Sequence, residues 1–521
     1  MSISKRNQED GVQESSESKA LKNAVCFPTV QLPNIPDQSF VITQYGAVSD
    51  GLTDNTEAFK RTIAACSAAG GGKVVIPAGI WLTGPIVMKS GINLHAMAGA
   101  LIMFSPVFEH YSLILSQFEG KSAVRSQSPI DGEGLEDIAI TGEGIFDGNG
   151  EAWRPVKRQK LTAAQWEKQV ASGGVVAANG EIWWPTAAAM NGEAEVQRLR
   201  RTGSYEVTEY IAVRDFLRPA LVSLRNCQRI LLDGPTFQNS PGWCLHPWGS
   251  EHVTVRNTSV RNPWFSQNGD GLDVESCRYV MVENCIFDVG DDAICLKSGK
   301  DEEGRKVGLP CEYVTIKGCN VYHGHGGFVI GSEMSGGVRH VHVSDCNFIG
   351  TDIGLRFKSA RGRGGIVEDI VIEDIRMKNI ALEAISFHLF YQGVEGSEGF
   401  DDSSYLVDEG TPIFRNVEIR NIRCAGASAA FLINGLSEMP LSQCRLQDVI
   451  IKSKRGIICR HGSGLDFRNI HLQIESGPLA SFHDCMNVDI EEMDGSTEDS
   501  AVEQLIQITG TKSDRIRVKT A

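Results

Sequence analysis

The sequence has no long apolar run. No stretch of about 18 apolar residues occurs in the 521-residue chain, which argues against a membrane-spanning helix. The segment from Met1 to about Lys22 is polar and charged and has no apolar core of the kind found in signal peptides. We therefore expect a disordered lead-in over residues 1–25 and a cytoplasmic location.

Metal-site and nucleotide-binding patterns are also missing. Cysteine and histidine are not spaced as in metal sites, and no phosphate-binding glycine loop occurs. We expect no cofactor, no nucleic-acid partner and no membrane partner. The sequence leaves the oligomeric state open.

An internal repeat dominates the second half of the chain. In each repeat, a β-branched residue is followed two positions later by another, and further apolar residues stand five and seven positions on, with one threonine among them. This is a period-2 strand, a turn and a second inward-facing pair. The repeats begin at Val253, Val280, Val314, Val341, Ile370 and Val417.

The spacing of the repeats is irregular, at 27, 34, 27, 29 and 47 residues. Such spacing suits a parallel β-helix whose loops vary in length. Position four of each repeat carries a residue type that tolerates a tight corner. These residues are Asn257, Asn284, Gly318, Asp345, Asp374 and Asn421. We expect an all-β, single-domain solenoid of roughly ten coils within residues 26–521.

Two further patterns concern the ends and the core of this solenoid. Asp54-Asn55-Thr56-Glu57 is a helix-start signal, and Gly70-Gly71-Gly72 ends the apolar pattern that follows it. We expect a short N-terminal helix that caps the first coil. Several of the 14 cysteines occupy inward positions of successive coils, where a thiol acts as a small apolar side chain, so we expect them to be reduced.

Four short motifs stand at solenoid spacing. Each comes before or within the second strand of a coil, so they become neighbours when the coils stack about 4.8 Å apart. The motifs are Asn268-Gly269-Asp270, Gly290-Asp291-Asp292, Gly324-His325-Gly326 and Arg356-Phe357-Lys358. Any one of them alone is more often a turn or a solvated strand face. Together they predict an acidic patch beside a basic one.

Crowded carboxylates suggest acid–base chemistry. Repulsion among Asp270, Asp291 and Asp292 should raise one pKa and leave a proton donor near neutral pH. Glycoside hydrolysis requires two carboxyl groups in unlike protonation states, one to protonate the leaving oxygen and one to activate water.

The four motifs resemble the signatures of glycoside hydrolase family 28, the polygalacturonases, and the resemblance extends from about Tyr45 to Gln392. It implies a right-handed parallel β-helix, the pectin lyase-like solenoid, and inverting hydrolysis of α-1,4-linked galacturonic acid in pectin-derived oligosaccharides. Gly269 and Phe357 depart from the residues that are commoner at their positions, and both are intervening positions.

The resemblance also implies roles for single residues. Asp291 would be the general acid, Asp270 and Asp292 would hold and activate water, and His325 would tune the acid. Arg356 and Lys358 would bind a substrate carboxylate by charge-assisted hydrogen bonds. The resemblance also places Tyr391 as a further sugar-contacting residue. Apart from the resemblance, His246 is predicted to bind substrate as one of the basic side chains of the cleft.

The net charge of −15 would repel a polyanionic substrate at long range, so we expect local cations to reverse the sign at the site. Insertions at 149–209, 299–310 and 393–412 are long enough to close one end of a cleft. Together with the run from Gly326 to Glu333, which resembles exo-acting members, they favour an exo-polygalacturonase. The tryptophans of the first insertion equally suit a small core of its own.

Three alternatives remain on sequence grounds. A Ca²⁺-dependent pectate lyase on the same fold would also cluster carboxylates, although the histidine and the Arg/Lys pair match the hydrolase better. A hydrolase of rhamnogalacturonan or another uronate glycan would keep the same catalytic residues. A non-catalytic glycan-binding solenoid would have no turnover to lose.

Overall fold

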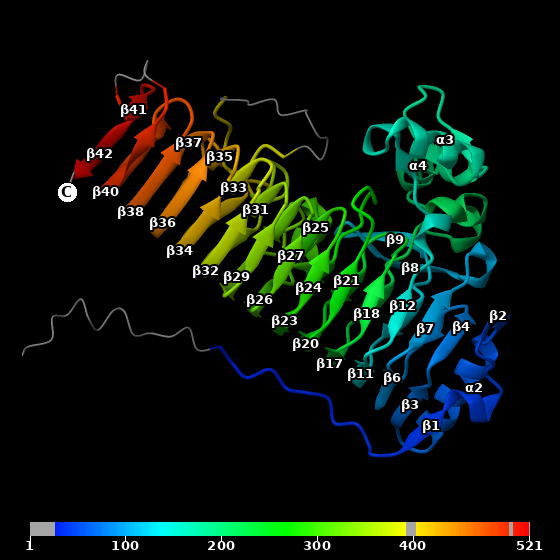
Figure 1. Cartoon of the computed structure of the whole chain (residues 1–521). Coiled ribbons are helices and arrows are strands. Elements are labelled where there is room, and N and C mark those ends of the chain that lie inside the picture. Colours follow the sequence, from blue (N-terminus) through cyan, green and yellow to red (C-terminus); the bar gives the residue numbers. More distant parts are fainter. Residues whose placement is uncertain (1–26, 392–402, 500–503, 520–521) are drawn as a thin grey trace, which may run out of the picture.

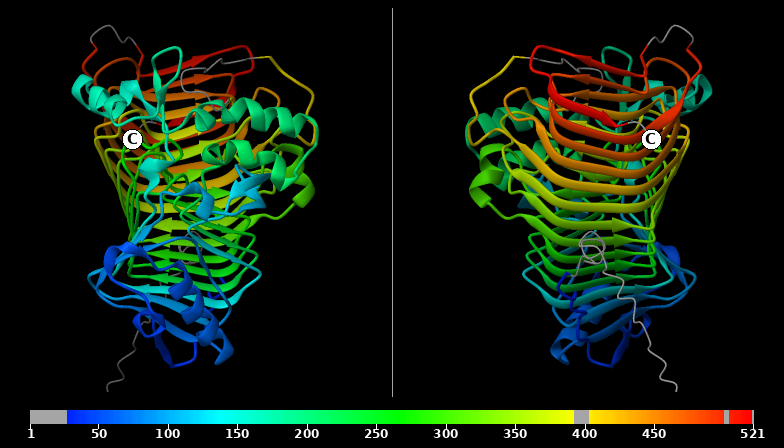
Figure 2. Two further views of the ribbon diagram at one scale, coloured as in Figure 1. Left: turned by 90° about the vertical axis from the view of Figure 1, so that its right-hand side faces the viewer. Right: turned by 90° about the vertical axis from the view of Figure 1, so that its left-hand side faces the viewer.

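The computed structural model describes residues 27–391, 403–499 and 504–519. The predicted lead-in over residues 1–25 lies outside the described residues, as does part of the predicted insertion at 393–412. The described chain is a right-handed parallel β-helix, as the sequence predicts. Its strands stack as successive rungs along one axis (Figure 1; Figure 2).

One face of the solenoid is a sheet of thirteen parallel strands, one from each coil. We call it the motif sheet, because it carries the four motifs. In spatial order its strands are β5 (Ile86–Val87), β10 (Ile130–Glu133), β16 (Val222–Arg225), β19 (Leu245–Trp248), β22 (Leu272–Glu275), β25 (Asp292–Lys297), β28 (Gly326–Ile330), β31 (Ile353–Lys358), β33 (Glu383–His388), β35 (Ala429–Asn434), β37 (Arg455–Arg460), β39 (Ala480–His483) and β41 (Ile506–Thr509). Thirteen coils exceed the roughly ten predicted, because strands as short as β5 carry no readable repeat.

The other faces belong to one sheet of 24 strands. Its longer ladder comprises β1 (Ser39–Val41), β3 (Gly72–Ile76), β6 (Ile92–Ala96), β11 (Glu136–Gly142), β17 (Gln228–Asp233), β20 (Glu251–Arg256), β23 (Arg278–Glu283), β26 (Cys311–Lys317), β29 (Val338–Ser344), β32 (Ile366–Lys378), β34 (Ile413–Ala425), β36 (Leu441–Ser453), β38 (Gly462–Ile474), β40 (Met486–Thr497) and β42 (Asp514–Lys519). Its shorter ladder comprises β2 (Asp50–Asp54), β4 (Gly79–Thr83), β7 (Ala100–Phe104), β12 (Ile145–Asp147), β18 (Thr236–Gln238), β21 (Ser259–Arg261), β24 (Ile286–Asp288), β27 (Asn320–Tyr322) and β30 (Asn347–Ile349). From β32 onward, one long bent strand spans both ladders.

The predicted corner residues turn the chain between these ladders. All six adopt a left-handed backbone conformation, with φ between 52° and 67°, which asparagine, aspartate and glycine tolerate better than other residues. The repeat starts also pair as predicted, since Val253, Val280 and Val314 are partners in adjacent strands. Equivalent positions of successive repeats are therefore paired residues in the sheet.

The core fills the inside of the coils with apolar side chains. Thirteen cysteines lie in the described residues, and all are buried and free. Cys285, Cys319 and Cys346 occupy the same inward position of three successive coils, as predicted. Helix α2 (Thr56–Ala68) covers the first coil through Phe59, Ile63 and other buried residues, which confirms the capping helix. No described helix has the length and apolar character needed to cross a membrane.

Two excursions leave the solenoid before β10 and before β16. The first is an antiparallel hairpin, β8 (Leu113–Phe118) and β9 (Lys121–Ser126), which follows the short helix η2 (Phe108–His110). The second is the predicted insertion, whose last element extends beyond residue 209. It contains η3 (Gly150–Ala152), β13 (Val156–Lys157), η4 (Arg158–Lys160), α3 (Ala163–Ala171), β14 (Val175–Val176), β15 (Ile182–Trp184), α4 (Ala187–Arg201) and η5 (Val207–Phe216).

The insertion and the hairpin share a small apolar core that is separate from the solenoid core. Leu113 and Val124 of the hairpin pack against Val196, Leu199 and neighbouring residues of the insertion. Trp153 is buried against the rings of Phe108 and Tyr111, and Trp183 is also buried. Two of the four tryptophan side chains of the insertion are thus buried in packing. Figure 1 shows α3 and α4 standing off from the strands.

Candidate active site

The four motifs meet on three neighbouring strands of the motif sheet and in the loop before a fourth. Asp292 begins β25, Arg356 and Lys358 lie on β31, and His325 directly precedes β28. Asp292 pairs with Gly326 across β25 and β28, and Val329 pairs with Arg356 across β28 and β31. Asp270 lies in the loop before β22, and the next residue, Gly271, donates its N–H to the Asp292 carbonyl at 2.9 Å. The predicted acidic and basic patches are therefore adjacent.

Small residues allow the carboxylates to approach. A Cβ added at Gly290 would lie 2.5 Å from the Pro263 carbonyl oxygen and 2.4 Å from Ser266 Oγ, so the loop before β25 can pack here only with glycine. The amide of Asn262 donates to the carbonyls of Gly269 and Asp270, at 3.1 and 3.2 Å. One oxygen from each of Asp270, Asp291 and Asp292 lies within 4.8 Å of the other two. Asn262 carries no motif, and sequence reasoning missed it.

The three carboxylates differ in exposure. Asp270 and Asp292 are 3% and 1% exposed, whereas the side chain of Asp291 is 20% exposed. Asp291 is therefore the member of the trio that offers the most surface to a ligand.

Asp291 and His325 form a hydrogen-bonded pair. His325 Nδ1 lies 3.2 Å from Asp291 Oδ1, and the His325 backbone N–H donates to the Asp291 carbonyl at 2.9 Å. Asp352 Oδ2 lies 3.8 Å from His325 Nε2, on the other side of the ring. The charge of Asp291 raises the pKa of His325, against the effect of burial. Asp352 was not identified from the sequence, because no motif surrounds it.

Asp292 is held by the two predicted cations. Lys358 Nζ donates to its Oδ2 at 2.6 Å, and Arg356 Nη1 donates to its Oδ1 at 3.2 Å. Burial raises the pKa of Asp292, but the charges of Lys358 and Arg356 outweigh it and hold that pKa below its ordinary value. Asp292 is therefore ionised. The ring of Tyr391 lies near both cations, 5.0 Å from Lys358 Nζ and 5.6 Å from the Arg356 guanidinium carbon.

The expected raised pKa falls on Asp270. Burial, with the charges of Asp273 and Asp291, raises the pKa of Asp270 well above its ordinary value. Burial acts in the same direction on Asp291, but the charge and hydrogen bond of His325 and the charges of Lys358 and Arg356 reverse the effect and lower its pKa. Of the three carboxyl groups, Asp270 is therefore the one whose surroundings favour the protonated form, while His325 lies where it can hold a proton beside Asp291.

The pH dependence of stability should reveal the proton on Asp270. A carboxyl whose folded-state pKa is raised favours the folded state below its unfolded pKa, near 3.8, and this stability is lost as pH rises through the folded pKa. Asp270→Asn cannot ionise, so it does not lose this stability. The melting temperature of the variant minus that of the wild type should therefore increase as pH rises from 4 to 8. The gain in unfolding free energy should be about 1.4 kcal/mol for each unit of raised pKa. If the difference in melting temperature between the two proteins stayed constant from pH 4 to pH 8, the raised pKa of Asp270 would be contradicted.

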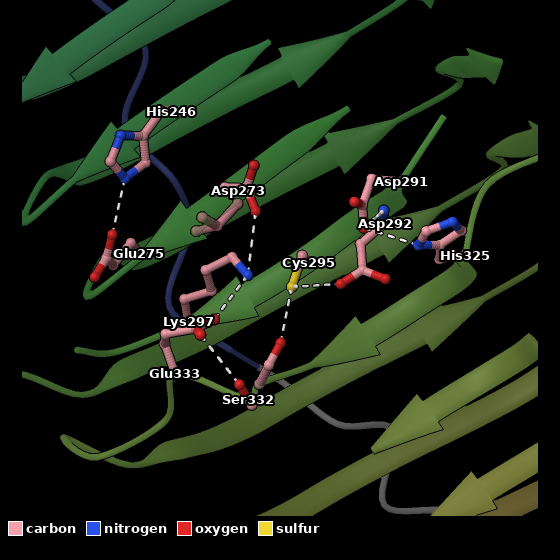
Figure 3. Close-up of polar contacts among 12 residues, drawn as sticks. His246, Asp273, Glu275, Asp291, Asp292, Cys295, Lys297, His325, Ser332 and Glu333 are labelled. Carbon is pink, nitrogen blue, oxygen red and sulfur yellow. Dashed lines mark hydrogen bonds and ion pairs between the residues drawn. The ribbon is translucent and has the colours of Figure 1, made fainter. Parts of the chain in front are cut away.

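A second buried polar cluster adjoins the trio (Figure 3). Lys297 Nζ lies 3.1 Å from Glu333 Oε2, 3.5 Å from Asp273 Oδ1 and 5.0 Å from the ring centroid of Trp243. Burial raises the pKa of Asp273, and the charges of Asp292 and Glu275 act in the same direction, against the charge of Lys297. This cluster comes from β22, β25 and the loop after β28, so it shares its coils with the trio and lies toward the ends of these strands.

His246 lies at the edge of this cluster and apart from the trio. It is 4% exposed, and its Nε2 lies 2.8 Å from Glu275 Oε2. A contact between His246 and substrate would require this part of the site to open. The substrate contact predicted for His246 stays a prediction.

The hairpin β8–β9 crosses the motif sheet over this second cluster. Phe118 packs on Trp243, with ring centroids 5.3 Å apart, on the side of the sheet where the strands begin. Beyond the other ends of the strands, Lys121 Nζ lies 2.7 Å from Asp301 Oδ2, where helix α5 (Asp301–Val307) begins. The Lys300 N–H donates to the Gly120 carbonyl at 2.9 Å.

The hairpin therefore bridges the two sides of the motif sheet and blocks it on the N-terminal side of the trio. The predicted insertion at 299–310 supplies α5 as the docking point of the bridge. Sequence reasoning missed the hairpin itself. Its signal was the pair Glu119-Gly120 between two six-residue strands, a common turn pattern.

Among the described residues, the same trio forms a group whose oxygens lie close enough together to hold a metal ion. Carboxylates in this number could hold a hard cation such as Ca²⁺. Both oxygens of Asp292, however, already accept hydrogen bonds from Arg356 and Lys358. The donor set therefore suits proton chemistry better than cation binding.

Comparisons with known proteins point in one direction. Residues 213–465 match the sequence pattern of the protein family described as glycosyl hydrolases family 28. The chain is 27% identical to a probable polygalacturonase of Vitis vinifera, over 79% of this chain and 73% of the relative. It is 31% identical to an exo-poly-alpha-D-galacturonosidase of Dickeya chrysanthemi, over 72% of this chain, and spans 60% of that longer protein.

The structural comparison extends over more of the chain. The crystal structure of a hyperthermoactive exopolygalacturonase from Thermotoga maritima superimposes with a TM-score of 0.73 and 32% identity. The match covers 85% of this chain and 94% of that structure.

Proposed function

Since the chain belongs to glycosyl hydrolases family 28, we propose that it is a polygalacturonase that hydrolyses α-1,4-linked galacturonic acid in pectin-derived oligosaccharides, acting from a chain end. The observation that carries the proposal is the trio of Asp270, Asp291 and Asp292 beside Arg356 and Lys358. It combines carboxyl groups in unlike protonation states with a site for a sugar carboxylate.

Exposure supports Asp291 as the general acid. Asp291 offers the most surface of the three carboxyl groups, so it is the group that a glycosidic oxygen can touch. Its proton comes from His325, whose Nδ1 lies 3.2 Å away. A substrate carboxylate at Arg356 and Lys358 offsets their charges, which removes one cause of the lowered pKa of Asp291. Substrate binding therefore favours transfer of the proton from His325 to Asp291 and then to the leaving oxygen.

The two buried carboxyl groups act on water. Asp292 is ionised and can accept a proton, whereas Asp270 carries one and can fix the orientation of a water molecule. The water attacks the anomeric carbon while Asp292 takes its proton, and the bond to the leaving oxygen breaks as Asp291 gives up its own. Direct attack by water inverts the anomeric configuration.

The hairpin bridge supports the exo-acting assignment. A polymer lying along the motif sheet would meet β8–β9 directly beside the second cluster, where Phe118 covers Trp243. A chain end fits against such a barrier, and the middle of a chain does not. The names of the Dickeya and Thermotoga relatives point to the same activity.

One experiment separates the candidate activities. The protein is incubated in chelator with trigalacturonate whose reducing end carries a label, and products are followed by chromatography and proton NMR. The proposal predicts early release of unlabelled monogalacturonate with inverted anomeric configuration. An unsaturated, ultraviolet-absorbing product would indicate a lyase, and retained configuration would overturn direct attack by water. The closeness of the three carboxyl groups makes this last readout informative, because retaining enzymes hold their pair only about 5 Å apart.

Should trigalacturonate stay intact, the same assay on rhamnogalacturonan fragments tests the alternative hydrolase. Absence of any product with either substrate, combined with measurable binding, would indicate a non-catalytic solenoid.

A further inference from the structure

A cavity of about 280 Å³ lies between the hairpin, the insertion and the loop that leads to Asp270. Phe118 contributes from the hairpin, Trp184 from β15, and Asn268 from the loop. Its volume is near the lower end of the ~300–1,000 Å³ range of ligand pockets, which suits a ligand of monosaccharide size. Aromatic walls beside polar groups are typical of sugar sites.

Two guanidinium groups, that of the buried Arg125 and that of the half-buried Arg218, line this cavity without a carboxylate partner. Arg218 donates from Nη1 to the carbonyls of Pro241 and Gln267, at 3.1 and 2.8 Å, and from Nη2 to Asn268 Oδ1 at 2.8 Å. Arg125, which is 8% exposed, donates to the Arg218 carbonyl and lies over the Phe118 ring at 3.7 Å. Among the residues that the structure describes, neither guanidinium takes part in an ion pair.

The acidic residues of the cavity bind elsewhere. Glu119 Oε2 lies 3.7 Å from Lys300 Nζ, and Glu193 accepts a hydrogen bond from Gln197 at 3.2 Å. Burial, together with the charge of Arg218, lowers the pKa of Arg125 to about 9, although Glu119 acts in the opposite direction. Burial likewise lowers the pKa of Arg218 to about 10. Buried charge without a partner destabilises a fold, so an anion bound here would stabilise both arginines.

We propose that this cavity binds the carboxylate of the terminal uronic acid of the substrate, at a site separate from Arg356 and Lys358. Arg125 and Arg218 supply the charge, and the rings of Phe118 and Trp184 flank the sugar. Arg200 lines the cavity from α4 and is exposed, which places a third cation at its rim. The inference rests on the proposed function, because it names the binding site for the terminal sugar that the same reaction releases.

The site would also connect ligand binding to the catalytic loop. Arg218 bonds to Gln267 and Asn268, and Asp270 follows two residues later. An anion bound by Arg218 therefore acts on the segment that positions Asp270. Recognition of a charged chain end and assembly of the acid trio become parts of one network.

The test uses galacturonate as the probe, since the protein cannot cleave a monosaccharide. Isothermal titration is carried out with the wild type, Arg125→Met, Arg200→Met and Lys358→Gln, with galactose as the uncharged control. The matched control is Arg198→Met, which removes an exposed arginine of the same helix that pairs with Glu195 at 2.6 Å.

We expect galacturonate binding to weaken at least tenfold in Arg125→Met and about threefold to tenfold in Arg200→Met, and to persist in Lys358→Gln and Arg198→Met. Arg125→Met should also melt at a higher temperature than the wild type without ligand, because it removes a buried unpaired charge. Equal affinity in the wild type and both cavity variants, or loss of all binding in Lys358→Gln, would overturn the site. Failure of the proposed function has another signature, since the wild type would then bind galacturonate and release nothing from trigalacturonate.

Discussion

Replacing Asp291 by asparagine should reduce the turnover of trigalacturonate by about 10²–10⁴-fold while the protein stays folded. The amide has no proton to give to the leaving oxygen, yet it keeps the size of the carboxyl group. Its oxygen can still accept the 2.9 Å hydrogen bond that the backbone N–H of Asp292 donates to Asp291 Oδ1. Initial rates and the melting temperature, measured on the same preparation, separate the loss of chemistry from the loss of structure.

The same variant carries a second readout that a purely structural role would not produce. The charge of Asp291 raises the pKa of His325, so Asp291→Asn should lower that pKa toward its ordinary value. Proton NMR titration of the histidine ring measures this shift directly. An unchanged His325 pKa would separate the two residues and remove the proposed source of the proton.

Asp288→Asn is the matched control for Asp291→Asn. Asp288 lies three residues earlier on β24, and its exposed carboxylate pairs with His323 at 2.9 Å. It is thus another Asp–His pair in the same coil, remote from the cations Arg356 and Lys358. Its variant should keep turnover within about twofold of the wild type. A comparable loss in both variants would attribute the effect to the coil and not to acid catalysis.

The solenoid was readable from the sequence because its determinants are local. A β-branched residue two positions before another, and an asparagine, aspartate or glycine at the corner two positions later, recur in the six repeats, as in Val280, Val282 and Asn284. Parallel stacking then fixes the neighbours of every strand residue. The order of motifs along the chain therefore became an order in space, and the trio with its two cations followed.

The bridge over the motif sheet could not be predicted in this way. Ser122 donates to Glu303 across 181 residues of sequence, and no periodicity relates a hairpin to a helix so far along the chain. The exact protonation states were equally hidden. Repulsion among three carboxylates predicts that one pKa rises, but only the position of His325 and Lys358 shows that it is the pKa of Asp270.

The second cluster was missed for a related reason. Asp273 and Lys297 belong to strands that also read as ordinary core, since each stands beside buried valine or leucine. Whether such a residue faces inward or toward the outer surface depends on the strand register alone. Its partner Glu333 comes from the next coil, beyond β28, at the end of a run whose resemblance to exo-acting members says nothing about a contact with Lys297.

Lys358→Gln should lower kcat/KM on trigalacturonate by about 10²–10³-fold, through two effects that the choice of substrate can separate. The first is loss of the charge that receives the sugar carboxylate. The second is loss of the 2.6 Å hydrogen bond to Asp292, which raises the pKa of Asp292 and moves the acidic limb of the pH profile upward.

A methyl ester distinguishes the two effects. Esterification of the sugar carboxylate removes the substrate charge and leaves Asp292 untouched, so the second effect is the same for acid and ester. The wild type should therefore prefer the free acid strongly, whereas the preference should shrink about 10–100-fold in Lys358→Gln. Lys317→Gln, which removes an exposed lysine at the end of β26, should leave the preference unchanged. If Lys358→Gln slows acid and ester by the same factor, Lys358 serves only to hold Asp292 ionised, and the recognition of the sugar carboxylate must rest on Arg356 alone.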